Sequence, residues 1–106
     1  KENKKILILS NGGTIYKKNI QKILNKIDIV KLSLDCVSNK CFEKLNRIDK
    51  SVDCRVIVKS MIDFRKIYKK EFIIEILFVK NLNDNQNEIE LLNDTLIKIK
   101  PNRIDI

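Results

Sequence analysis

The chain has 106 residues, of which 43% are apolar, and a formal net charge of +8 from 22 basic and 14 acidic side chains. This length suits one small domain or part of a larger fold, and the apolar content is enough for a core. No apolar run approaches the roughly 20 residues that span a bilayer, and no signal peptide opens the chain, so we expect a soluble cytoplasmic protein without a membrane partner. The positive charge is compatible with RNA, although short lysine pairs are also typical of a solvated surface.

The strands and helices are predicted from apolar runs and from helical spacing, taken in chain order. Residues 6–9 are continuously apolar and predict a buried strand, which is followed by helical spacing over 16–27 and a second strand at 29–35. Ser38 is expected to cap a short helix.

The second half of the chain continues the same alternation. Residues 53–70 predict a longer helix, 72–79 an almost wholly apolar strand, and 85–99 a helix with Asn85 as its cap and Pro101 marking its end. A last strand is predicted at 102–106. The short links between these elements predict an α/β fold built from a parallel βα repeat with about four strands.

The second predicted strand places polar side chains on one face. Lys31, Ser33 and Asp35 alternate with apolar residues, and strand side chains alternate between faces. Strands covered by helices on both faces are apolar throughout, so this pattern indicates that one face borders a polar cavity. Ligands of parallel α/β folds gather at the carboxyl ends of strands, and three such ends are polar here, at 10–13, 33–35 and 80–84.

Glu75 interrupts an otherwise apolar strand, and a buried charge needs a partner. Lys31, on the preceding strand and facing the polar side, is the expected partner. The pair is either a structural filling of the interior or a substrate-facing pair.

The residue types exclude several kinds of chemistry. The chain has no histidine, no Gly-x-x-x-x-Gly-Lys phosphate loop and no Gly-x-Gly-x-x-Gly fingerprint, which leaves little support for ordinary hydrolases, kinases or dehydrogenases. Cys36, Cys41 and Cys54 are odd in number and lack the paired spacing of a zinc site or disulfide framework. We therefore interpret them as small apolar residues and expect no metal ligand in the chain.

Several short motifs together resemble the central part of the core domain of the radical S-adenosylmethionine superfamily. Within it, the pattern is most similar to iron–sulfur oxidoreductases related to the enzyme that builds the wyosine base of transfer RNA. The resemblance implies that residues 1–106 are a fragment of a partial (β/α)6 TIM-like barrel, covering its strands three to six. It is carried by residues 10–12, 31–35, 38–42, 44–47, 64–66 with Tyr68, 78–84 and 101–104.

The resemblance also implies a chemistry and a set of site residues. In that family a [4Fe-4S] cluster reductively cleaves S-adenosylmethionine to a 5′-deoxyadenosyl radical. Carried over, Ser33 and Asp35 would contact the cofactor, Asn11 and Gly12 would shape the neighbouring turn, and Asn83 would brace the loop after the next strand. The Cys-x-x-x-Cys-x-x-Cys cluster loop is absent from the chain and is expected upstream, so the chain alone is expected to be inactive.

A second hypothesis is a non-catalytic basic α/β module that binds RNA, or the remnant of a split gene. Exposed sheet edges would in either case favour self-association. The substrate is not predicted by the sequence.

Overall fold

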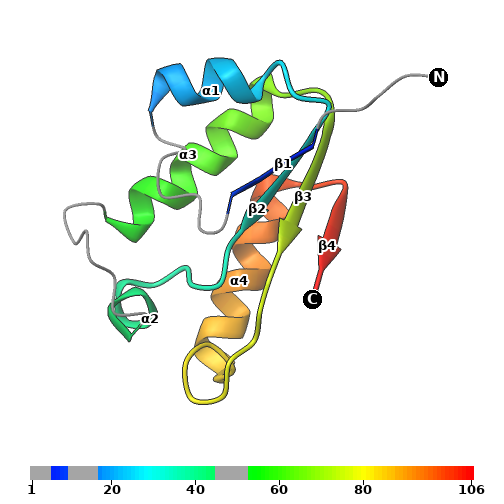
Figure 1. Ribbon diagram of the computed structural model, residues 1–106. Coiled ribbons are helices and arrows are strands. Elements are labelled where there is room, and N and C mark those ends of the chain that lie inside the picture. Colours follow the sequence, from blue (N-terminus) through cyan, green and yellow to red (C-terminus); the bar gives the residue numbers. More distant parts are fainter. Residues whose placement is uncertain (1–5, 10–16, 45–52) are drawn as a thin grey trace.

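A computed structural model of the chain describes residues 6–9, 17–44 and 53–106, and it is an α/β structure with a parallel sheet (Figure 1). The described residues form the strands β1 (Ile6–Leu9), β2 (Ile29–Ser33), β3 (Glu71–Glu75) and β4 (Arg103–Asp105). The helices are α1 (Lys18–Leu24), α2 (Asn39–Lys44), α3 (Cys54–Ile67) and α4 (Gln86–Ile99). The predicted alternation of strands and helices is therefore confirmed for the described residues.

The strands lie side by side in chain order, β1-β2-β3-β4, and each neighbouring pair is parallel. Residues paired across a parallel sheet share a face, so the register defines two sets of side chains. One set contains Val30, Leu32, Phe72 and Ile74, all fully buried. These residues form the core together with apolar residues of the helices, among them Ile57, Met61, Phe64, Leu92 and Ile99.

The other face of the sheet carries the polar residues. Ser33, Glu75 and Asp105 are in register across β2, β3 and β4, and Lys31 is in register with Ile73 and Arg103. Apolar side chains from the helices pack on the Val30 and Phe72 face, so the polar set lies on the opposite face. We call this the open face because no helix of the described residues packs on it, although Ile73 there is only 4% exposed.

Two strands end earlier than their apolar sequence predicts. β2 ends at Ser33 and β3 at Glu75, although the apolar run of β3 continues to Val79. The backbone N–H groups of Leu77 and Val79 donate to the side chains of Asp35 and Asn83. These side chains supply partners for the N–H groups of residues 77 and 79, whereas the Ile76 N–H still donates to the Asp105 carbonyl at 2.8 Å.

Both predicted helix caps are present. The Ser38 hydroxyl accepts a hydrogen bond from the Cys41 N–H at 3.1 Å, and the Asn85 side chain accepts one from the Glu88 N–H at 2.9 Å. α3 ends at Ile67 because Tyr68 adopts an extended backbone, and its hydroxyl donates to the Ile27 carbonyl at 2.7 Å. Among the described residues no helix is long and apolar enough to cross a membrane.

Candidate functional site

The open face of the sheet carries a row of charged and hydroxyl side chains at the carboxyl ends of the strands. Lys31 Nζ lies 3.1 Å from the carboxylate of Asp105 and 3.9 Å from that of Glu75. Arg103 forms a second ion pair with Asp105 at 2.8 Å. The hydrogen bonds from Arg103 and Lys31 lower the pKa of Asp105, which favours its ionised form.

The expected contact between Lys31 and Glu75 is therefore made, but with two differences. Asp105 is the nearer partner of Lys31, and the sequence analysis missed it because the pairing of β3 with β4 brings it beside Glu75. The Glu75 side chain is also 48% exposed, so the premise that it lies in an apolar interior is wrong for this chain.

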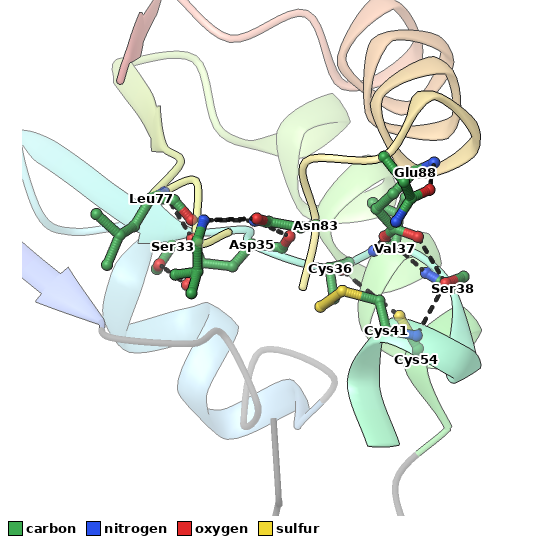
Figure 2. Close-up of a disulfide and its surroundings, with 12 residues drawn as sticks. Ser33, Asp35, Cys36, Val37, Ser38, Cys41, Cys54, Leu77, Asn83 and Glu88 are labelled. Carbon is green, nitrogen blue, oxygen red and sulfur yellow. Dashed lines mark hydrogen bonds between the residues drawn. A yellow bond between two sulfur atoms is a disulfide. The ribbon is translucent and has the colours of Figure 1, made fainter. Parts of the chain in front are cut away.

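Asp35 links the ends of β2 and β3. Its carboxylate accepts a hydrogen bond from the Ser33 hydroxyl at 3.3 Å and one from the Leu77 N–H at 2.9 Å (Figure 2). Ser33 and Asp35, which the sequence analysis grouped as binding residues, are thus in contact with one another. Much of the hydrogen-bonding capacity of Asp35 already serves the chain itself.

Asn83 is fully buried and braces the loop after β3 from inside. Its amide nitrogen donates to the carbonyls of Asp35 and Leu77, and its amide oxygen accepts from the Val79 N–H. Both donors and the acceptor of the side chain are used within the chain. Asn83 therefore positions Asp35 and Leu77 and offers no group to a ligand.

A second polar cluster follows directly after Asp35, and Figure 2 shows the two clusters side by side. Cys36 and Cys41 form a disulfide with a Cα–Cα distance of 5.5 Å. The carboxylate of Glu88, from the first turn of α4, accepts hydrogen bonds from the Val37 N–H at 2.6 Å, the Ser38 N–H at 3.3 Å and the Ser38 hydroxyl at 2.6 Å. Glu88 is 3% exposed, so this cluster is buried.

The disulfide corrects the interpretation of Cys36 and Cys41 as plain apolar residues. The turn of α2 after Ser38 folds the chain back, and this brings two cysteines five residues apart within bonding distance. Cys54 is a free, buried thiol that donates to the Cys36 carbonyl at 3.6 Å. Burial, together with the charge of Glu88, raises the pKa of Cys54 to about 12.

Two of the predicted site residues, Asn11 and Gly12, lie outside the described residues. Ser33, Asp35 and Asn83 are brought together at the ends of β2 and β3, while Lys31 and Glu75 lie beside Asp105 on the open face. Glu88 was not singled out as a site residue. The available signal was its position three residues after Asn85, the predicted cap of this helix.

The chain is similar to proteins named UPF0026. It is 40% identical over 104 residues to a UPF0026 protein of Helicobacter pylori, and 26% identical over 98 residues to UPF0026 protein MJ1312 of Methanocaldococcus jannaschii. It is also 30% identical over 101 residues to the GTPase Obg of Brachyspira hyodysenteriae, and this match covers 15% of that GTPase. The chain spans 33% and 30% of the two UPF0026 relatives, about a third of their length. No family model and no solved structure matches it.

These findings correct the radical S-adenosylmethionine identification. The relatives are named UPF0026 or GTPase Obg, and none of these names indicates that superfamily, an oxidoreductase, S-adenosylmethionine or a [4Fe-4S] cluster. Two of the cysteines are joined in a disulfide and do not form a cluster motif. The motifs were short, and those at 10–12, 31–35 and 78–84 contain Asn, Gly, Ser and Asp, which are common wherever parallel strands end in turns. Binding of RNA, the expectation from charge, stays a prediction.

Proposed function

We propose that the chain forms a ligand-binding wall of a larger parallel α/β protein. The ligand is a small polar molecule that lies over the open face at the carboxyl ends of β2, β3 and β4. The observation that carries this proposal is the row of Ser33, Glu75 and Asp105, in register on the sheet face that the helices leave uncovered. Residues 1–106 are then one part of that protein.

The order of the strands supports a barrel wall as the finer architecture. In doubly wound sheets the strand order reverses at a switch point, whereas in a barrel each strand lies beside its predecessor and the helices form one outer layer. The order β1-β2-β3-β4 with a one-sided core fits the second pattern. The UPF0026 relatives are about three times as long as the matched segment, which leaves enough chain for the missing strands.

The charges of the open face favour a ligand with both hydrogen-bond donors and acceptors. Lys31 and Arg103 are positive and are balanced by Glu75 and Asp105, so no single sign dominates the row. A GTPase activity is not part of the proposal, although one relative bears that name. The match covers a small part of that relative, and the chain lacks a Gly-x-x-x-x-Gly-Lys-Ser/Thr loop.

Equilibrium dialysis of the complete encoded protein against a mixture of amino acids, nucleotides and sugar phosphates tests the proposal, with mass spectrometry as the readout. We expect one compound class to be enriched by the wild type, and this enrichment to fall at least about tenfold when Ser33→Ala and Glu75→Gln are combined. Asp63→Asn is the matched control, because this carboxylate pairs with Lys59 on the exposed side of α3. No enrichment, or equal enrichment by all three proteins, would contradict the proposal.

A further inference from the structure

The buried cluster after β2 brings three potential metal ligands together. The Sγ atoms of Cys36 and Cys41 and a carboxylate oxygen of Glu88 lie within 4.8 Å of one another. Each of the three residues is 3% exposed. Ligands of a tetrahedral Zn²⁺ ion lie about 3.6–3.8 Å apart, as follows from metal–ligand distances of about 2.1–2.3 Å. Once the disulfide is reduced, the two sulfurs need to separate to about 3.8 Å for all three residues to surround one ion.

Glu88 is already oriented as a ligand would be. Its carboxylate is held by three neutral donors, which are the N–H groups of Val37 and Ser38 and the Ser38 hydroxyl. Among the residues that the structure describes, no lysine or arginine forms an ion pair with it. A buried carboxylate without a counter-charge is costly, and a divalent cation would supply that charge. Hydrogen bonds that hold a ligand in place are a regular feature of metal sites.

The cluster also has a route to solvent. A cavity of about 460 Å³ is lined by Cys41 and Glu88 together with Ser38, Leu82 and Leu91, among others. Two of the three candidate ligands thus border a space through which an ion and a water molecule can enter.

We propose that this cluster is a redox-controlled Zn²⁺ site. A dithiol reduces the Cys36–Cys41 disulfide: it gives two electrons and two protons, its own sulfurs become a disulfide, and Cys36 and Cys41 become thiols. Zn²⁺ then displaces the two thiol protons to solvent and binds both thiolates and Glu88, with water as the fourth ligand. The metal keeps its charge throughout. This proposal does not depend on a ligand at the open face.

Cobalt substitution in the complete encoded protein tests this site. The protein is reduced with dithiothreitol, freed of the reductant without oxygen, and titrated with Co²⁺, whose thiolate complexes absorb in the near ultraviolet. We expect the reduced wild type to bind one more ion than the oxidised wild type and to show this absorption. Zn²⁺ should displace the Co²⁺.

Variants assign the signal to the cluster. Cys41→Ser should abolish the thiolate absorption, Glu88→Gln should weaken binding at least tenfold, and Cys54→Ala should leave it unchanged, since Cys54 is the nearby thiol outside the proposed ligand set. Equal cobalt binding by reduced and oxidised wild type would overturn the proposal, and this comparison needs no variant to fold. Loss of binding in Cys54→Ala, with circular dichroism unchanged, would overturn the ligand set.

Discussion

At the scale of single residues, Glu88 joins α4 to the segment after β2. Its carboxylate accepts three hydrogen bonds from Val37 and Ser38, and it does so in a buried position. The Ser38 hydroxyl both donates to Glu88 and accepts from the Cys41 N–H. One acidic side chain therefore connects the start of α4, the start of α2 and the disulfide.

Glu88→Gln should lower the free energy of unfolding by about 1–3 kcal/mol, because an amide NH₂ group replaces one of the two acceptor oxygens and leaves buried donors unsatisfied. Urea unfolding followed by circular dichroism measures the change. Glu90→Gln, an exposed position of the same helix, is the control and should change the value by less than about 0.5 kcal/mol. Equal effects of the two substitutions would show that the buried contacts contribute little.

Asn83→Ala should also destabilise the protein, by about 2–3 kcal/mol, because it removes a buried side chain whose amide oxygen and nitrogen make three hydrogen bonds. The same unfolding measurement applies, with Asn93→Ala on the exposed surface of α4 as the control. Asn83 accepts from the Val79 N–H and also holds Asp35, whose carboxylate accepts from the Leu77 N–H. We therefore expect the backbone amide signals of residues 77 and 79 to shift in NMR spectra. A stable variant without those shifts would rule out the bracing role.

At the scale of elements, the start of α3 depends on an ionised side chain. Asp53 accepts a hydrogen bond from the Arg55 N–H at 2.8 Å and forms an ion pair with its guanidinium at 2.8 Å. These contacts with Arg55 lower the pKa of Asp53 from 3.8 to about 2. Since the folded pKa lies below the unfolded value, ionised Asp53 stabilises the fold fully above pH 3.8, and this contribution is lost as the pH falls toward about 2.

Asp53→Asn keeps a capping oxygen but does not titrate, so the stability difference between wild type and variant should shrink from about pH 5 to about pH 2. Urea unfolding at several pH values measures that difference. The control is Asp94→Asn, which removes a carboxylate from an exposed position of α4 and leaves the start of α3 unchanged. A difference for Asp53→Asn that does not depend on pH would mean that its charge adds nothing to the cap.

The elements were predictable from the sequence because each depends on local spacing and local caps. The ends of the elements and the contacts between them were less predictable. The sheet stops at Glu75 because two side chains take backbone donors of the following loop: Asp35, which is distant in the sequence, accepts from Leu77, and Asn83, four residues after Val79, accepts from Val79. The disulfide and the contact of Lys31 with Asp105 depend on how α2 folds back and on how β4 joins the sheet, and neither is encoded in a local pattern.

At the scale of the whole molecule, the sheet has two edge strands, β1 and β4, whose outer backbone groups have no neighbouring strand among the described residues. Such edges favour pairing with another chain. The side chains near β4 add to this tendency, because Ile104 is 41% and Ile106 is 87% exposed. We therefore expect any self-association of the chain to occur at this edge of the sheet.

Ile104→Lys should reduce self-association of the 106-residue chain, since a charge on an edge strand opposes strand pairing while the backbone of β4 is kept. Sedimentation velocity over a range of concentrations measures the association. Ile97→Lys is the matched control: Ile97 is 62% exposed but lies on α4, so it removes a similar apolar surface away from the edge. If both variants reduce association equally, general surface hydrophobicity drives it, whereas a selective effect of Ile104→Lys assigns it to β4. That second outcome would also mark β4 as the place where a further strand of a longer protein adds to the sheet.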